Sequence, residues 1–281
     1  MRPTTRKRLL TCIDKTQAAW AAGFFDAEGS TVFGRNGARR RLRVQVPQSD
    51  RGCGVEALER FRSAVGGVGL IGGPDAKGVF TYYASNLGDS ITVFERIVPW
   101  LSGPKRKQFV LHGTAAMAAM TTGARPVGRR SVRRRANLDH LRRVLRRAAA
   151  PPEAMTAEES DAWATGLLEG DGSIDVSGGV TDGTEYLTLR VAVGQSDAFG
   201  VPEVLTRFQG VAGGGRIYRM DLRGRNCMPE YKWTLARPNE VEHLLARLRP
   251  YLGQRKSLQA ERALAAHAEF TARRAILRAS R

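Results

Sequence analysis

The sequence has few cysteines, few acidic residues relative to basic ones, and no long apolar run. Its three cysteines, Cys12, Cys53 and Cys227, are odd in number and none has a C-x-x-C partner, which argues against a disulfide framework or a zinc finger. No apolar run approaches the ~20 residues that a membrane-spanning helix requires. The basic start lacks the apolar core of a secretory signal. We therefore expect an intracellular protein, in the cytoplasm, nucleoid or an organelle matrix, with no membrane partner.

Positive charge dominates what is present. Lysine and arginine number 45 against 27 acidic residues, which gives a formal net charge of +18. A balance this basic favours a polyanionic partner, with nucleic acid as the leading candidate. A ribosome-associated or simply soluble basic protein has the same composition, so charge alone does not separate these classes. The length of 281 residues is enough for two modest domains with their own cores.

The chain is internally duplicated. Residues 19–30 read AWAAGFFDAEGS and residues 162–173 read AWATGLLEGDGS. Two further repeats follow in the same order, with an offset that grows slowly along the chain. The first is Gln48-Ser49-Asp50, repeated as Gln195-Ser196-Asp197. The second is Pro99-Trp100-Leu101, followed by Lys105 and Gln108, and repeated as Pro250-Tyr251-Leu252, followed by Lys256 and Gln259. Three repeats in one order indicate two related halves rather than chance.

The halves are predicted to span residues 1–122 and 156–281, joined by an Arg-rich linker over 123–155. We expect the linker to be part helical around residues 137–147, as a solvated charged helix or as a contact for phosphates. Each half shows helix, two strands, helix, two strands and further helices. Asn36-Gly37, between two alternating segments, is a strong hairpin signal.

The repeated helix carries small residues four apart and ends in an acid. Ala19, Gly23 and Ala27 match Ala162, Gly166 and Gly170; such stripes let two helix backbones approach closely. The packing would bring together Glu28 and Asp171, whose repulsion a hard divalent cation such as Mg²⁺ would relieve. A metal there could activate water against a phosphodiester. The alternative is that each acid is a solvated helix end. We interpret Asp26 and Glu169 as supporting residues, and Gly29 and Gly172 as left-handed C-terminal caps.

The strings AAGFFDAEG and ATGLLEGDG resemble the LAGLIDADG motif of the homing endonucleases. The duplication is similar to the single-chain, two-motif branch of that family. The resemblance implies an α+β fold of two pseudo-symmetric αββαββα halves, with antiparallel saddle-shaped sheets along the major groove of a long asymmetric DNA site. It also implies a staggered, metal-dependent double-strand cut by a monomer. Mg²⁺ is the expected ion, with Mn²⁺ or Ca²⁺ able to substitute for binding.

The family's site residues map onto three pairs in this chain. Glu28 and Asp171 match the metal-binding acids, with a backbone ligand around residue 27 left unassigned. The polar active-site position matches Gln48 and Gln195, and the basic residue near the scissile phosphates matches Lys105 and Lys256. Departures are Ala21, Ala164 and Thr165 within the motifs and Glu28 where Asp is commoner. Both glutamines fall on the apolar phase of their strands, so a bulge or a strand end has to turn them toward the site.

Basic and polar residues alternate with apolar ones along the predicted strands. This period of two predicts a sheet with one apolar face and one basic face, and arginine and glutamine on such a face can read guanine and adenine. The alternative is an ordinary solvated sheet face. The predicted DNA-binding set is Arg35, Arg39, Arg41, Arg43, Gln45, Thr188, Arg190, Arg216, Arg219, Arg223, Arg225 and Lys232.

Two other functions stay open at this point. A DNA-binding protein with the same fold could lack cleavage, although relatives of that kind lose the metal acids that are present here. An RNA maturase could assist splicing of a host intron, with the basic linker as its RNA contact, and that activity could coexist with cleavage.

Overall fold

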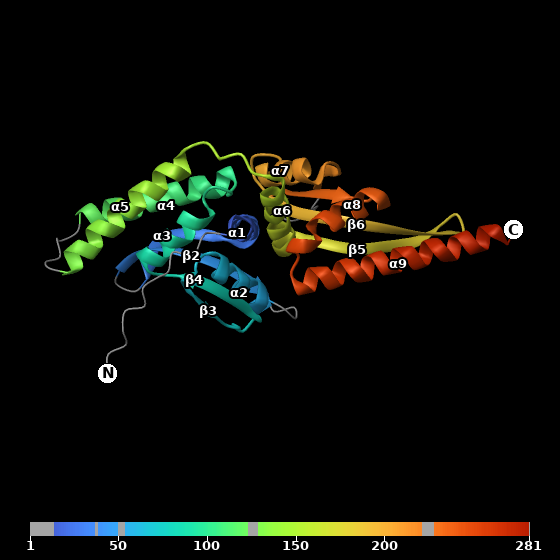
Figure 1. Cartoon of the computed structure of the whole chain (residues 1–281), viewed down its shortest axis with the longest axis horizontal. Coiled ribbons are helices and arrows are strands. Elements are labelled where there is room, and N and C mark those ends of the chain that lie inside the picture. Colours follow the sequence, from blue (N-terminus) through green and yellow to red (C-terminus); the bar gives the residue numbers. More distant parts are fainter. Residues whose placement is uncertain (1–13, 37–38, 50–53, 123–128, 221–227, 281) are drawn as a thin grey trace.

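The computed structural model describes residues 14–36, 39–49, 54–122, 129–220 and 228–280. It confirms the α+β prediction: two four-stranded antiparallel sheets, each accompanied by helices, lie on either side of a central pair of helices (Figure 1). Within these described ranges no helix is both long and apolar enough to cross a membrane.

The first half contains one four-stranded sheet with the order β1-β2-β4-β3. Its elements run in the predicted order of helix, hairpin, helix, hairpin and helices: α1 (Lys15–Glu28), β1 (Ser30–Asn36), β2 (Arg39–Ser49), α2 (Gly54–Ala64), β3 (Leu70–Gly72), β4 (Val79–Ala84), α3 (Leu87–Ile97) and α4 (Gly103–Thr122).

The second half repeats that order, and its sheet has the equivalent arrangement β5-β6-β8-β7. Its last helix runs along the hairpin to the outer end of the molecule (Figure 1). The elements are α6 (Ala157–Asp171), β5 (Gly172–Thr181), β6 (Thr184–Ser196), α7 (Glu203–Ala212), β7 (Arg216–Met220), β8 (Glu230–Leu235), α8 (Pro238–Leu248), η1 (Arg249–Tyr251) and α9 (Gln254–Ala279).

One helix of the first half has no counterpart among the described residues of the second. Helix α5 (Arg129–Ala149) begins earlier than the predicted helical part of the linker. It buries an apolar stripe against α3 and α4, and Arg106 of α4 donates from Nε to the carbonyl of Ala148 at 3.0 Å, capping its end. Most arginines in the C-terminal part of α5 face solvent. The segment between the motifs is therefore partly an added layer on the first half rather than a tether.

Helices α1 and α6 touch through their backbones, as the small-residue stripes predict. A Cβ atom on Gly23 would lie far inside van der Waals contact of the Trp163 carbonyl oxygen, and one on Gly166 would meet the Trp20 carbonyl oxygen in the same way. The N-termini are capped by Asp14 and by the predicted box of Thr156 and Glu159. The flanking aromatic and leucine side chains are fully buried in the cores of the two halves.

The glycines that end both helices do not adopt the predicted left-handed conformation. Gly29 has φ −75° and ψ 149°, and Gly172 has φ −97° and ψ 162°. The reason is that each motif helix is followed directly by a strand, which needs extended backbone. Glycine is required there for space instead, because a Cβ would collide with the Phe25 ring or with Leu168.

Two arginines that the sequence analysis did not single out join the halves symmetrically. The Arg60 guanidinium lies 4.0 Å from the centre of the Trp20 ring and donates to the Tyr251 carbonyl of the other half at 2.6 Å. Arg207 lies 4.0 Å from the Trp163 ring and donates to the Trp100 carbonyl at 2.8 Å. Each combines a cation–π contact with a hydrogen bond across the seam, which is the contact between the two halves along α1 and α6.

The backbone contact predicts the effect of adding side chains. We expect Gly166→Val to lower the free energy of unfolding by about 3 kcal/mol or more, because the added methyls force α1 and α6 apart. Urea unfolding measures the change. Gly210→Ala is the matched control: this glycine of α7 has open space around it, so alanine should be neutral or stabilising by up to about 1 kcal/mol. An equal response of the two variants would contradict the close packing.

Candidate active site and nucleic-acid surface

The two motif acids lie together at the seam between the halves. Glu28 is the last residue of α1 and Asp171 is the last residue of α6. The helix ends are so close that a Cβ on Gly170 would stand 3.0 Å from Cγ of Glu28. The packing inferred from the stripes therefore does bring the two carboxylates to one place.

Both carboxyls hold their protons more tightly than usual. Burial, followed by the charge of Asp171, raises the pKa of Glu28 to about 7, although Lys105 and Arg255 oppose the shift. Burial raises the pKa of Asp171 to about 6, against the effects of Lys105, Gln195 and Lys256. A pair of partly buried acids at two helix C-termini is electrostatically unfavourable without a cation between them.

A lysine stands beside each acid in the same geometry. Nζ of Lys105 donates to the carbonyl of Gly29, directly after Glu28. Nζ of Lys256 donates to the carbonyl of Gly172, directly after Asp171. Burial lowers the pKa of Lys256 to about 8 and also lowers that of Lys105. Each half thus contributes a set of one acid, one glycine carbonyl and one ammonium group.

The two glutamines occupy equivalent strand positions but have different surroundings. Nε2 of Gln195 donates to Oδ2 of Asp171, and the pairing of β6 with β8 runs without a bulge. It is therefore the strand end that brings this side chain to the acid. Gln48, also in an unbroken register, is buried and lines a small cavity of about 20 Å³ with residues that include Trp20, Arg60 and Glu169. Among the described residues it makes no hydrogen bond to Glu28.

The donor set at the seam suits a hard divalent cation. It offers two carboxylates, which are hard oxygen ligands, and leaves further coordination positions for water or phosphate oxygens, as Mg²⁺ prefers. In the described part of the chain no cluster of three or more Asp, Glu, His or Cys side chains is arranged to hold a metal. Any ion here would consequently depend on the pair Glu28 and Asp171.

The first sheet presents a basic face away from the helices. The β1–β2 register puts Arg41, Arg43 and Gln45 on the open side, opposite the buried Leu42 and Val44. The backbone register places Arg39 opposite Asn36 and Arg35 opposite Arg40. The side chains of Arg35 and Arg39 lie outside the described parts of the structure.

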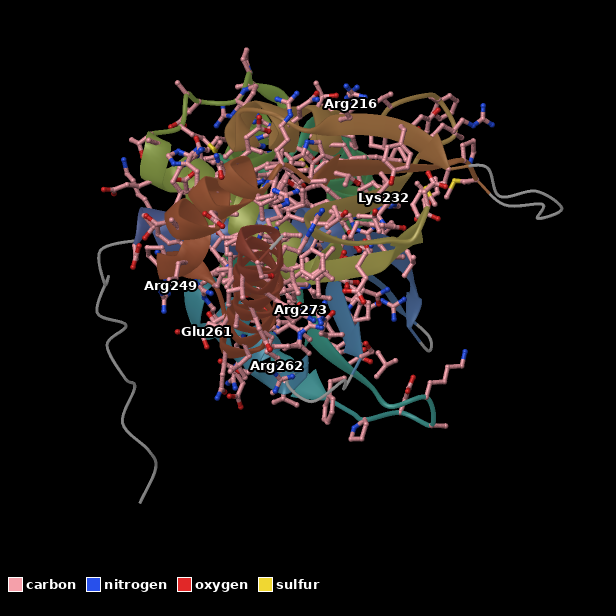
Figure 2. The ribbon with its side chains drawn as sticks, turned by 90° about the vertical axis from the view of Figure 1, so that its right-hand side faces the viewer. Arg216, Lys232, Arg249, Glu261, Arg262 and Arg273 are labelled. Atoms are coloured by element: carbon pink, nitrogen blue, oxygen red, sulfur yellow. The ribbon has the colours of Figure 1, made fainter. Side chains whose placement is uncertain are left out.

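The second sheet has a similar open face with a different charge pattern. Thr188 and Arg190 of β6 share it with Arg216 and Lys232, which stand on neighbouring strands (Figure 2). Arg190 is paired with Asp175 at 2.9 Å. Arg219 falls on the helix-facing phase with Ile217. Arg223 and Arg225 lie outside the described residues.

The open faces also carry aromatic residues that the sequence analysis missed. Tyr83 pairs with Gln45, and Tyr218 pairs with Lys232; both rings are exposed. Period-two alternation along residues 79–84 was the signal that could have found Tyr83. Charge alone does not mark such a residue, whereas strand phase does.

Comparison with known proteins bears on the fold. No family model and no curated protein matches the sequence. Solved structures do match: LAGLIDADG homing endonuclease I-GzeII in complex with its DNA target (14% identity, 91% of each chain, TM-score 0.60) and LAGLIDADG meganuclease I-CpaMI bound to uncleaved DNA (12% identity, 91% of this chain and 92% of that one, TM-score 0.63). The chain has the LAGLIDADG homing endonuclease fold.

A third structure with this fold was determined with a metal. I-SmaMI bound to uncleaved DNA in the presence of calcium ions is 17% identical, over 89% of this chain and 92% of that one, with a TM-score of 0.58. The likeness in all three extends over both halves, so the resemblance inferred from two short motifs is confirmed as a shared LAGLIDADG fold.

The raised pKa values predict that the acid pair lowers the free energy of unfolding as the pH rises. A carboxyl whose pKa is raised by folding contributes stability below its unfolded pKa, here near 4.5, and that contribution is lost as the pH rises toward about 7. We therefore expect Glu28→Gln to raise the free energy of unfolding relative to wild type at pH 8 but not at pH 4. Urea unfolding at both pH values measures it, with exposed Glu59→Gln as control. An equal gain at both pH values would be inconsistent with the raised pKa.

Proposed function

We propose that this protein is a site-specific DNA endonuclease that makes a staggered double-strand cut in a long, asymmetric target by metal-dependent hydrolysis. The observation that carries the proposal is the meeting of two acid, carbonyl and lysine sets at the seam between two open, basic sheets. The DNA-bound structures that share the fold support it. The duplicated sets match a duplex, which has two strands to cut.

The residues at the seam have separable roles in this proposal. Glu28 and Asp171 hold the divalent ion, which when bound supplies an activated water and neutralises charge on the leaving oxygen. Lys105 and Lys256 place ammonium groups beside the acids, where they stabilise negative charge on a scissile phosphate. Gln195 fixes one oxygen of Asp171 and leaves the other for the ion.

The sheets supply the binding energy and the choice of site. Arginine, lysine and glutamine side chains on the open faces contact phosphates and base edges in the major groove. Since both sheets belong to one chain and carry different residues, the protein acts as a monomer on a target whose two halves differ. Mg²⁺ is the proposed ion, with Mn²⁺ or Ca²⁺ able to occupy the same ligands.

An RNA-splicing role is the second candidate. The exposed arginines of α5 lie on an added helix that packs on α3 and α4, so the proposed reading of DNA by the sheets does not use them. Splicing of the host intron measured with and without the protein tests this role. It is compatible with DNA cleavage and needs no change in the seam.

Cleavage is the first test. One substrate is a plasmid that carries the two DNA sequences flanking the open reading frame, joined directly to each other. The other substrate is a plasmid library of random inserts. Wild type with Mg²⁺ should linearise its target. Glu28→Gln and Asp171→Asn should bind the same DNA and make no double-strand cut, because each removes one of the two charged ligands.

Glu59→Gln, an exposed acid on α2, is the control and should cut like wild type. Full cleavage by Asp171→Asn would contradict the proposal that both acids hold the metal ion. Binding without any cut by the wild-type protein would instead favour the non-cleaving alternative.

The two sheets should differ in their electrostatic contribution to binding. DNA affinity is expected to fall steeply with salt, and each lost phosphate contact should reduce the slope of log K against log salt by about 1. We predict a larger reduction for Arg41→Ala than for Arg190→Ala, since Arg190 is already paired with Asp175. Fluorescence anisotropy over a salt series measures the slopes. A flat salt response in wild type would count against phosphate binding.

A further inference from the structure

Each motif contains a second acid, two residues before the acid at the seam, and both of these are buried. Asp26 is 3% exposed and Glu169 is 4% exposed. A buried carboxylate needs donors around it. The partners of these two carboxylates show what they hold in place.

Asp26 accepts hydrogen bonds from Ser102, the residue that precedes α4. The backbone N–H of Ser102 donates to its two carboxylate oxygens at 3.1 and 3.0 Å, and the Ser102 hydroxyl donates at 2.7 Å. In the second half the backbone N–H of Gly253, the residue that precedes α9, donates to Glu169 at 2.5 Å. The same link therefore occurs twice, built from different side chains.

Ser102 and Gly253 are the start points of the helices that carry the lysines. The carbonyl of Ser102 accepts the helical hydrogen bond from the N–H of Arg106, and that of Gly253 accepts from Ser257. The N–H groups that they offer to the acids lie at the positive end of each helix dipole, where an anion is favoured. Lys105 and Lys256 each follow three residues later.

The contacts form a two-point clamp with identical spacing in both halves. In the first half residues 26 and 29 of the motif hold residues 102 and 105. In the second half residues 169 and 172 hold residues 253 and 256. One point is carboxylate to backbone N–H, and the other is glycine carbonyl to lysine ammonium. With either point removed, the first turn of the lysine-bearing helix keeps only one of these two links to the motif helix.

We propose that Asp26 and Glu169 are positioning residues, each of which fixes the lysine of its own half beside the seam acid of that half. They act through the first turn of α4 or α9 and do not touch the reacting atoms. The inference rests on the proposed function, because it concerns how each half presents its lysine to one DNA strand.

The two acids differ in what else they do. Asp26 also accepts the indole N–H of Trp163 at 2.9 Å, which ties it to the opposite motif helix. The equivalent indole N–H of Trp20 is buried without a partner in the described part of the chain. Removal of Asp26 would therefore break a hydrogen bond across the seam. Glu169 makes no such bond among the described residues, although it lines the small cavity with Gln48 and Arg60 of the first half. Glu169 is the cleaner position for a test.

The experiment measures cutting of each strand separately, on a supercoiled plasmid and on end-labelled duplex. Glu169→Ala should slow one strand about 10- to 100-fold and leave the other within about 3-fold, so nicked circles accumulate. The slowed strand should be the one slowed by Lys256→Ala. Glu169→Gln keeps an oxygen for the Gly253 N–H and should recover most of the rate. Affinity measured with Ca²⁺ should change by less than about 3-fold.

Ser102→Ala is the second variant, because it removes only the hydroxyl bond to Asp26 and keeps both backbone bonds. It should slow the opposite strand, the one slowed by Lys105→Ala, by several-fold. Exposed Glu59→Gln is the control. Equal slowing of both strands, or no recovery with Glu169→Gln, would overturn the positioning role. If wild type cuts neither strand, the proposed function fails first, and that result is distinguishable from a loss of strand bias.

Discussion

The close contact between the backbones of α1 and α6 is the constraint on which the rest of the structure depends. Gly23 and Gly166 allow each helix to reach the carbonyl groups of the other. Since each helix ends in an acid and passes directly into the first strand of its sheet, this one contact sets both the separation of the carboxylates and the relative position of the sheets. A wider helix spacing would change the separation of the two acids and the relative position of the open sheet faces together.

That contact has an electrostatic cost, and the surroundings show how it is offset. Two acids at adjacent helix ends repel each other, and burial raises the pKa of both. The chain places Lys105 and Lys256 on the neighbouring glycine carbonyls, while Arg60 and Arg207 join the halves further along the seam. Lys105 and Lys256 reduce the repulsion that the packing creates. Arg60 and Arg207 instead interact with the charges of the other two buried acids, Glu169 and Asp26. A site that violates a local rule in this way is typical of a functional centre.

The duplicated motif made most of this fold predictable, because small-residue spacing, strand alternation and the order of the repeats are local signals. The alternation of Arg41 and Arg43 with Leu42 and Val44 correctly assigned the faces of β2. The extent of α5 was not predictable, since its buried stripe depends on α3 and α4. Nor was the conformation of Gly29, which depends on the strand that follows. The links from Arg60 to Tyr251 and from Asp26 to Ser102 join residues far apart in sequence, and no local pattern marks them.

The two halves share a backbone plan and differ in the side chains that complete it. Gln195 bonds Asp171 whereas Gln48 faces a small cavity; Trp163 bonds Asp26 whereas the indole of Trp20 is left unpaired in the described structure. Arg190 is neutralised by Asp175 whereas no acid of the described residues pairs with Arg41. In the proposed endonuclease each half serves one DNA strand, so only the backbone plan has to stay symmetric. The side chains are free to diverge, and through them one chain would match two unlike half-sites and treat the two strands unequally.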